Sequence, residues 1–414
     1  MSNNLLTISM ITNEALMVLE NDTVFTKGVT REYDDQFAIT GAKIGNTLNI
    51  RRPGRFIGTT GPNLNVEDFN ETYVPVTLST QFHVDTQFTT QDLALSLGAF
   101  SDRIVKPTVA AIANKVDRDG LQWAKNATYN LVGTPGTPAT ALSDYLTAAA
   151  YLDAEAAPRD GQRKMFVEPF TSAGLVNSLT GLFNPQAKVG EQYTKGLMGK
   201  DTGGMDFYMD QNVVNHAFGY ATAAATVTMN GANQGLATGW AQTSNLNITT
   251  AQTITLNVGD TFTIAGVYGV NPQNRQSYGK LRNFVVTAAL AGVTGAQTVT
   301  VSPALIYGGQ FQNVTNTPGT SAAITFASLP ASQAAQVTAA QNILCHRNAF
   351  TLAMADLEMP EGVHFAGRAS DKEVGMSIRI VRQYTINNDS IPARFDVLYG
   401  YGSLYPELSC RVTS

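Results

Sequence analysis

Histidine is a side chain that often supplies acid–base or metal chemistry, and this sequence contains four of them, His83, His216, His346 and His364. No two histidines form the i, i+4 pair of a helical metal site, and none belongs to an HExxH motif. Cys345 directly precedes His346, so the two side chains would point apart in regular structure. We therefore predict no local catalytic or metal site, although ligands distant in the sequence could still converge.

Two glycine-containing stretches have some likeness to phosphate-binding loops. In TKGLMGKD, the P-loop pattern requires Gly and Ser or Thr at the positions that Thr194 and Asp201 occupy. The stretch AGVYGVN has two glycines without a preceding βαβ unit, and its pattern favours a strand and a turn. Because no nucleophile stands with a base either, we expect no catalytic residue and no cofactor.

Acidic residues are grouped at two places in the chain. Asp117 and Asp119 flank Arg118 within a helical pattern, and Asp34 is followed by Asp35 near the N-terminus. Paired carboxyl groups can perform acid–base chemistry. A run of charges more often forms a solvated or interface surface, and we predict that role for both groups.

Arg51, Arg52 and Arg55 form the densest basic group, on a predicted hairpin. A guanidinium group pairs well with a carboxylate through two parallel hydrogen bonds. We therefore predict that these arginines are contacts between subunits and meet carboxylates of a neighbouring copy. A solubilising role is the alternative.

Composition limits the class of protein. The chain has 414 residues, enough for two or three domains, and only 14 % of them are charged, against about 25 % in ordinary soluble proteins. The formal net charge of −5 and the absence of a basic tract argue against tight general binding to nucleic acid. No signal peptide or stretch of 18 apolar residues is evident, and two cysteines, Cys345 and Cys410, are typical of a reducing compartment. We expect synthesis in the cytoplasm, no membrane segment and burial of both cysteines.

The first part of the chain predicts elements that cannot be stable alone. A short helix near 12–24 leads into an irregular polar arm, and alternating residues predict a strand at 47–50. Apolar residues of one parity predict a second, long strand over 73–88, with glycines and a proline at the tip between the two. Such a two-stranded projection is marginal in isolation, so it needs a neighbour.

A long helix is predicted over 101–128. Its apolar stripe has helical spacing and consists of Val105, Val109, Ile112, Val116, Gly120 and Trp123. Ser101 or Asp102 can cap its start. A mixed segment follows to about residue 220, in which RKMFVEPFTSAGLVNSL predicts a buried strand leading into a helix.

Residues 221–335 differ from their flanks because they contain only four charged residues, Asp260, Arg275, Lys280 and Arg282. Short alternating strands separated by Gly, Pro and Asn turns predict a small antiparallel sheet or barrel, with one turn at Gly259–Asp260. The composition then changes back, and strands are predicted at 377–386 and 394–401. We therefore interpret residues 222–335, below called the insertion, as a module placed within another domain.

The order of these elements resembles the major capsid proteins of tailed phages, and most closely the podovirus coat-protein branch that carries an insertion domain. The stretches that carry the resemblance are ITNEALMVLENDTVF, REYDDQFAITGAKIGNTLNIRRP, RIVKPTVAAIANKVDRDG and IPARFDVLYGYGSLYPEL. The resemblance implies an α+β fold of the Hong-Kong-97 capsid type with an inserted antiparallel β-rich domain.

The resemblance also implies a division of the chain. The expected parts are an N-terminal arm at 1–45, an extended β-hairpin loop at 46–88, a peripheral domain with a spine helix at 89–135, an axial domain beginning at 136–221, the inserted domain at 222–335, and a final axial and peripheral part at 336–414. In the family the inserted domain aids folding of the subunit and lies on the outer face of the shell.

A shell-forming function without an active site follows from the resemblance. Hexamers and pentamers of the chain would form an icosahedral virion shell around double-stranded DNA, assembled in the host cytoplasm. Implied partners are other copies, a separate scaffolding protein, portal and decoration proteins, and weakly contacted DNA. Two alternatives stay open: a secreted or tail-associated β-rich adhesin, and an enzyme with a β-rich accessory domain.

Overall fold

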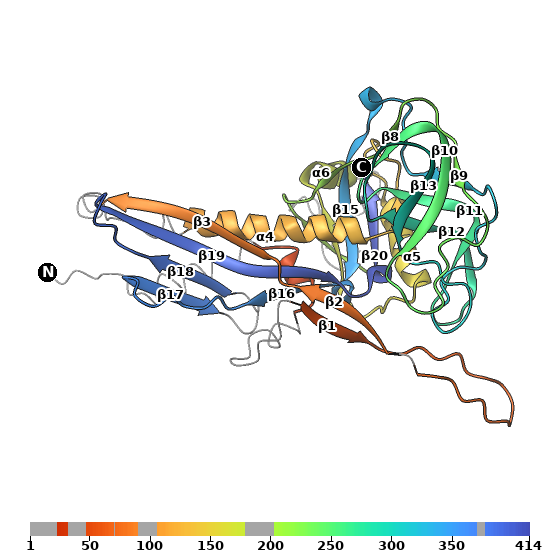
Figure 1. The fold of residues 1–414 in the computed structure, drawn as a ribbon, viewed down its shortest axis with the longest axis horizontal. Helices are drawn as coiled ribbons and strands as arrows, with labels where there is room; N and C mark the ends of the chain where they lie inside the picture. Colours follow the sequence, from red (N-terminus) through yellow and green to blue (C-terminus); the bar gives the residue numbers. More distant parts are fainter. Residues whose placement is uncertain (1–22, 32–46, 70, 90–105, 179–202, 371–376) are drawn as a thin grey trace, which may run out of the picture. The chain divides into compact units, whose positions relative to one another are not determined.

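The computed structural model describes residues 23–31, 47–69, 71–89, 106–178, 203–370 and 377–414 of an α+β chain (Figure 1). Contacts divide the chain into two compact units. Unit 1 contains residues 1–50, 74–120 and 350–402, and unit 2 contains residues 51–73, 121–349 and 403–414. The expected N-terminal helix and the start of the long helix lie outside the described residues.

Unit 1 contains a five-stranded sheet. Its strands, in the order β16-β19-β18-β17 with β3 also paired to β19, are β16 (Phe350–Ala355), β19 (Ser390–Ser403), β18 (Ser377–Arg382), β17 (Phe365–Ser370) and β3 (Thr80–Thr89). The pairs of β19 with β18 and with β3 are antiparallel. Ile378, Ile380 and Phe395 are buried in this unit. The two predicted C-terminal strands are thus confirmed as β18 and β19.

The predicted strand over 73–88 is interrupted. It consists of β2 (Thr72–Thr77), which pairs with β1 (Thr47–Arg52), and of β3, which pairs instead with β19. The apolar residues lie at alternate positions through both strands. Val74 and Val76 are buried, and Phe82 and Val84 are half-buried. The expectation of one continuous strand was wrong because alternation specifies the buried face and not the pairing partner.

Helix α4 (Lys106–Ala127) confirms most of the predicted stripe. Val109, Ile112 and Val116 are at most 1 % exposed. Trp123 is an exception, because it is 46 % exposed while Ala124 is buried. The helical period allows either position to face inward, and the structure places the small side chain there.

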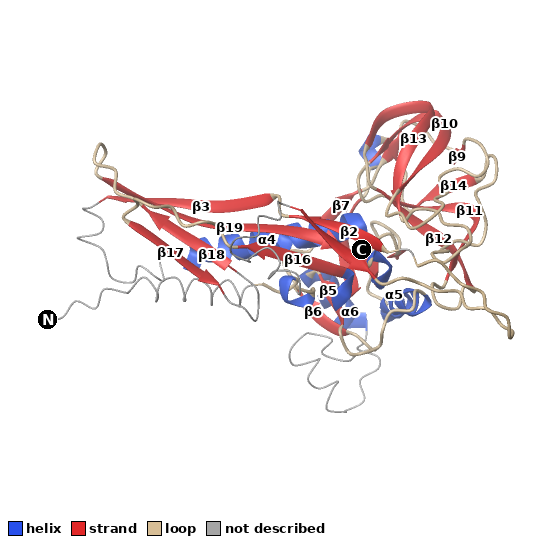
Figure 2. Cartoon of the chain, turned by 60° about the horizontal axis from the view of Figure 1, so that its bottom comes forward, coloured by secondary structure: helices blue, strands red, loops and turns tan. Residues whose placement is uncertain are grey.

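A six-stranded sheet organises the part of unit 2 outside the insertion. Its strands, in the order β4-β20-β15-β5-β6 with β7 also paired to β15, are β4 (Leu131–Val132), β20 (Ser409–Thr413), β15 (Thr338–His346), β5 (Arg163–Val167), β6 (Asp206–Met209) and β7 (Asn215–Ala217). Two helices accompany it, α5 (Leu142–Ala154) and α6 (Pro169–Ser178) (Figure 2). Met165, Leu344 and Cys410 are buried in one core with α5 residues. The predicted buried strand followed by a helix is confirmed as β5 and α6.

The insertion forms a closed barrel with a core of its own. Its strands are β9 (Val227–Met229), β10 (Ser244–Leu256), β11 (Thr261–Val270), β12 (Ser277–Val286), β13 (Leu290–Ser302) and β14 (Ala323–Phe326), preceded by β8 (Tyr220–Ala221). The ring runs β13-β12-β11-β14-β9-β10 and closes through antiparallel pairing of β10 with β13. Leu246, Phe262 and Phe284 belong to its apolar core. Closure leaves none of these six strands as a free sheet edge, which agrees with the predicted barrel.

The two ends of the insertion are connected to neighbouring strands of the six-stranded sheet. β7 precedes it, β15 follows it, and these two strands pair in antiparallel register, with Ala217 opposite Thr338. The remaining described helices are short 3-10 turns: η1 (Thr26–Gly28), η4 (Gln333–Ala335), η5 (Arg347–Ala349) and η6 (Pro406–Leu408). None of the helices within the described residues is long and apolar enough to cross a membrane.

Both cysteines are free and buried, as predicted. Burial disfavours the thiolate and raises the pKa of Cys345 to about 12. The pKa of Cys410 is raised for the same reason. Neither thiol is therefore a reactive nucleophile.

Candidate functional site

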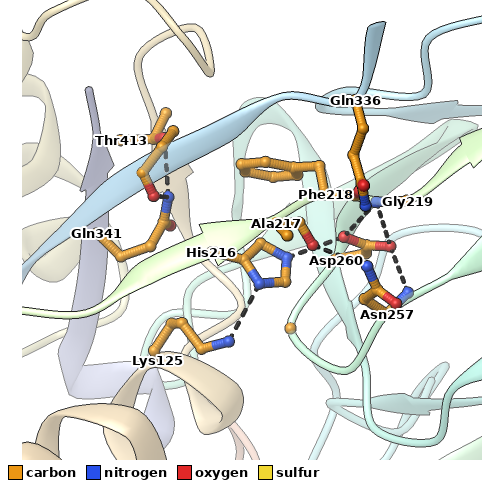
Figure 3. Close-up of polar contacts among 12 residues, drawn as sticks. Lys125, His216, Ala217, Phe218, Gly219, Asn257, Asp260, Gln336, Gln341 and Thr413 are labelled. Carbon is orange, nitrogen blue, oxygen red and sulfur yellow. Dashed lines mark hydrogen bonds and ion pairs between the residues drawn. The ribbon is translucent and has the colours of Figure 1, made fainter. Parts of the chain in front are cut away.

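A buried chain of three ionisable side chains lies where the insertion joins the six-stranded sheet (Figure 3). His216 lies on β7, and its Nε2 is 2.9 Å from Oδ1 of Asp260, in the turn between β10 and β11. Its Nδ1 is 3.1 Å from Nζ of Lys125, in the last turn of α4. Each of the three residues is at most 3 % exposed.

The partners of His216 define its protonation state. The Asp260 carboxylate can only accept, so Nε2 of His216 carries the proton and Nδ1 accepts a hydrogen bond from Lys125. Burial is the main cause that lowers the pKa of His216; the hydrogen bond to Asp260 opposes this shift, and the charges of Lys125 and Arg411 add to it. Burial and Arg411 also lower the pKa of Lys125 to about 8. Burial and the two neighbouring cations therefore outweigh the Asp260 carboxylate and favour a neutral imidazole.

Asp260 also fixes the backbone on both sides of the junction. Its carboxylate accepts from the N–H of Asn257 at 2.7 Å and from the N–H of Gly219 at 3.1 Å. A Cβ atom on Gly219 would lie 2.3 Å from the carbonyl oxygen of Thr255, so only glycine fits there. One carboxylate thus joins the β10–β11 turn of the insertion to the segment that follows β7.

Arg411 reaches the same turn from β20. Its Nη2 donates to the carbonyl oxygen of Gly259 at 2.8 Å. Burial lowers the pKa of Arg411 to about 10. Gln341 on β15 accepts from Arg411 at 3.4 Å and donates to Thr413 at 2.9 Å. The turn is therefore held directly from β7 and β20, and indirectly from α4 through His216.

A second buried cluster centres on Arg282 of β12. Its guanidinium forms an ion pair with Glu155, donates to the hydroxyl of Tyr129 at 3.0 Å, and lies 4.7 Å from the centre of the Tyr129 ring. The hydroxyl of Tyr278 donates to Glu155 at 3.2 Å. Burial raises the pKa of Glu155, and the charge of Arg282 opposes that shift. Removing either charge would leave the other buried without compensation.

These clusters support attachment and do not suit catalysis. Lys125, His216 and Asp260 could in principle pass a proton along their hydrogen bonds. A substrate must reach at least one of them, and all three are almost completely buried. Within the described part of the chain, no group of three or more His, Cys, Asp or Glu side chains is placed to hold a metal ion.

The charges of the insertion are concentrated at its contacts with the rest of unit 2. Asp260 binds His216, Arg282 binds Glu155, and Nη2 of Arg275 donates to a backbone oxygen at residue 56. The scarcity of charge in the insertion is visible in the sequence, but the position of these charges at the contacts with the rest of unit 2 is not. The scarcity of charge was the signal that could have located these contacts, because a charge buried among apolar residues needs a specific partner.

The predicted site residues Arg52 and Arg55 converge on one carboxylate of the same chain. Glu407 forms an ion pair with Arg52, and its Oε1 lies 3.3 Å from Nη2 of Arg55. The Arg52 guanidinium also lies 4.5 Å from the ring centre of Tyr405 and 5.1 Å from that of Trp240. The expected carboxylate partner exists, but it belongs to residue 407 of the same chain.

The third arginine of this group differs from the other two. The side chain of Arg51 is 78 % exposed and lies 3.4 Å from Glu71. That distance and exposure are those of a weak surface pair. Contact of these arginines with a neighbouring copy stays a prediction, for which Arg51 is the most accessible member.

The acidic group on α4 corrects the prediction of a solvated or interface surface. Asp117 is fully buried and accepts hydrogen bonds from the backbone N–H groups of residues 24–26. Asp119 accepts from the hydroxyl of Tyr399 at 2.6 Å. Only Arg118 of the three is exposed. Charge runs are usually solvated, but here unpaired backbone donors of a distant segment required an acceptor. The other acidic pair, 34–35, lies outside the described residues.

Comparison with known proteins gives a match over nearly the whole chain. The sequence model of the family described as "P22 coat protein - gene protein 5" matches residues 1–411. The search of curated protein sequences gave no match.

Three solved structures are among those to which this chain is similar. A structure from Mycobacterium phage Che8 is 12 % identical, with a TM-score of 0.46, and the alignment covers 94 % of this chain and 90 % of that one. The capsid of Ralstonia phage GP4 is 8 % identical, with a TM-score of 0.45 and coverage of 94 % and 87 %. The I-domain of the CUS-3 coat protein is 28 % identical, with a TM-score of 0.19, and covers 25 % of this chain and 96 % of its own.

The family match defines the class: this is a major capsid protein, which forms the shell of a phage particle. The chain belongs to the P22 coat protein family. The resemblance predicted from the sequence is thereby confirmed, and the adhesin and enzyme alternatives are not favoured.

Proposed function

We propose that the chain acts as a purely structural coat protein, without enzymatic activity, that assembles as hexamers and pentamers into an icosahedral shell around double-stranded DNA. The observation that carries the proposal is the loop between β1 and β2, described for residues 53–69 and 71 and below called the extended loop. Its apolar side chains are not covered within one chain: Phe56, Ile57, Leu64, Val66 and Phe69 are 50–90 % exposed. Apolar patches of this kind mark contacts with other molecules. Because the chain belongs to a family of coat proteins, the expected partner for such contacts is a second copy of the same chain.

In this proposal the loop is the tip of the extended β-hairpin loop that the sequence predicts at 46–88 in a Hong-Kong-97-type fold. Unit 1, with the five-stranded sheet, corresponds to the peripheral domain, and the six-stranded sheet of unit 2 corresponds to the axial domain. The barrel at 222–335 is the inserted domain, which would lie on the outer face of the shell. Few charges suit surfaces that end up against other copies, and the net charge of −5 suits weak contact with packaged DNA.

The proposal includes partners and a place of assembly. A separate scaffolding protein would guide assembly in the host cytoplasm, the portal would occupy one vertex, and decoration proteins could bind the completed virion. The support for these partners is the family resemblance.

Assembly of purified subunits tests the role of the loop. Leu64→Asp with Val66→Asp would replace two side chains that are 90 % and 77 % exposed, so folding of the subunit should be unchanged. Particle yield in electron microscopy should fall at least tenfold. Thr59→Asp, also exposed and on the same loop, is the matched control for added charge. Normal yield from the double variant would contradict the proposed role of the loop.

A further inference from the structure

We infer that the insertion grips the base of the extended loop, and that it thereby sets the direction in which the loop leaves unit 2. The inference deepens the proposed function, since it rests on the loop being the assembly contact. It concerns residues of unit 2 only, and the hydrogen bonds that carry it do not involve Asp260 or Arg282.

The insertion contacts both the outgoing and the returning part of the loop. Nη2 of Arg275 donates to the carbonyl oxygen of Phe56 at 2.8 Å, and Nε2 of Gln310 donates to that of Asp68 at 2.7 Å. The rings of Phe56 and Phe69 stack with their centres 6.0 Å apart, so the two parts are also joined to each other. Two hydrogen bonds on opposite parts of a loop restrict its rotation more than two on one part would.

The turn that carries Arg275 is held by hydrogen bonds within itself and to α5. Oδ1 of Asn271 accepts from the N–H groups of Gln273 and Asn274, at 2.9 and 3.1 Å. Nδ2 of Asn271 donates to the carbonyl oxygen of Ala154 at the end of α5, at 2.8 Å. This side chain therefore fixes the turn and anchors it outside the barrel. Arg275 therefore contacts the loop from a turn that is anchored to α5.

Arg52 fixes the strand from which the loop starts. Its guanidinium pairs with Glu407 and lies over the rings of Tyr405 and Trp240, and Trp240 belongs to the insertion. A cavity of about 60 Å³ beside this pair is lined by residues of all three parts, including Arg52 and Arg55, Trp240 and Glu407. The loop base, the insertion and the segment after β19 therefore meet at one point.

The remaining part of the loop is held by its own contacts. Glu67 accepts from the N–H of Ile57 at 2.7 Å and from the N–H of Gly58 at 2.6 Å. Beyond these residues, 59–66 are exposed. If the insertion grips the base, the two amides bonded to Glu67 should report on that grip, because the grip keeps the two parts of the loop together.

Hydrogen exchange in the free, full-length subunit tests the inference. Arg275→Ala combined with Gln310→Ala should accelerate exchange of the Ile57 and Gly58 amides about fivefold or more, since each lost hydrogen bond weakens the grip. Exchange of the barrel amides should be unchanged. Lys280→Ala is the matched control, because it removes an exposed charge of the insertion that is not seen to contact the loop. Loop exchange equal to that of Lys280→Ala would overturn the inference.

Particle assembly of the same variants separates the two proposals. Faster loop exchange together with reduced particle yield supports both of them. Faster exchange with normal yield supports the grip but contradicts the proposed role of the loop. Unchanged exchange contradicts the grip whatever the yield is. A third variant, Trp240→Leu, should loosen the loop base by removing the aromatic face under Arg52, and it tests the same inference without changing charge.

Discussion

The interior of the insertion is stabilised by apolar contacts, whereas its junction with the rest of unit 2 is formed by buried charged groups. The barrel interior is apolar, with residues such as Ile264 and Phe284 fully buried. At the junction, Asp260 and Arg282 are equally buried but are bound to charged or polar groups outside the insertion. Apolar burial has no preferred direction, whereas charged hydrogen bonds require defined geometry. The difference teaches that the few charges of the insertion specify how it is attached, while its apolar core makes it fold.

The largest effect is expected at the second buried cluster. Arg282→Ala would leave the Glu155 carboxylate buried and unpaired, at a cost of about 3–5 kcal/mol. Denaturant unfolding of the full-length subunit measures this loss. Arg282→Met combined with Glu155→Leu should recover most of the stability, because no unpaired charge remains. A loss below about 1 kcal/mol for Arg282→Ala would show that the pair is dispensable.

A pH dependence is expected from the first cluster. Because burial lowers the pKa of His216 in the folded state, the unfolded state binds the additional proton first as pH falls. The contribution of the neutral imidazole is complete above the unfolded pKa of about 6.5 and is lost as pH falls below it. His216→Gln should flatten this acid limb of the stability curve, and His364→Gln, at an exposed position, should not. Identical acid limbs for the wild type and His216→Gln would refute the assignment.

Lys125, at the other end of the same cluster, is expected to affect stability at alkaline pH. Burial lowers the pKa of Lys125 to about 8, so the unfolded state holds more protons between about 8 and its usual value near 10.5. The contribution of Lys125 to stability should therefore rise with pH across that interval. Lys125→Met should remove this rise, which thermal unfolding between pH 7.5 and 10 would detect. A rise that persists in Lys125→Met has another origin.

A moderate effect is expected at the base of the extended loop. Arg52→Lys keeps the charge but loses the planar group that lies over Tyr405 and Trp240. We expect a loss of about 1 kcal/mol and a change in the fluorescence of Trp240. Denaturant unfolding followed by fluorescence checks both, and an unchanged spectrum would argue against the stacked geometry.

The smallest effect is expected at Arg51. Its pair with Glu71 is solvent-exposed, so Arg51→Ala should change the stability of the free subunit by less than about 0.5 kcal/mol. A larger reduction in particle yield than in stability would support the predicted contact of Arg51 with a neighbouring copy. Wild-type yield would count against that contact.

Much of the local structure could be predicted from the sequence. The stripe at Val109, Ile112 and Val116 and the turn at Gly259–Asp260 follow from periodicity and turn chemistry, which act over a few residues. Burial of both cysteines followed from their ordinary behaviour. The arginine group was predicted to meet carboxylates of a neighbouring copy; Arg52 and Arg55 pair with Glu407 of the same chain, and contact with a neighbouring copy stays a prediction.

The partners that make the junction could not be predicted in the same way. Asp260 is 44 residues from His216, and Arg52 is 355 residues from Glu407. The spacing of residue types contains no information at such separations, because the pairing depends on how the sheets are ordered. For the same reason, the alternation in β3 gave the buried face but not its partner β19.

The most direct test of the account compares one substitution in two contexts. The fragment 222–335 should give a dispersed amide spectrum, because the barrel closes on its own apolar core. In this fragment Arg282→Ala should change the unfolding free energy by less than about 0.5 kcal/mol, whereas in the full-length subunit the loss should be about 3–5 kcal/mol. An undispersed fragment spectrum, or an equal loss in both contexts, would contradict the claim that the core folds the insertion and its charges attach it.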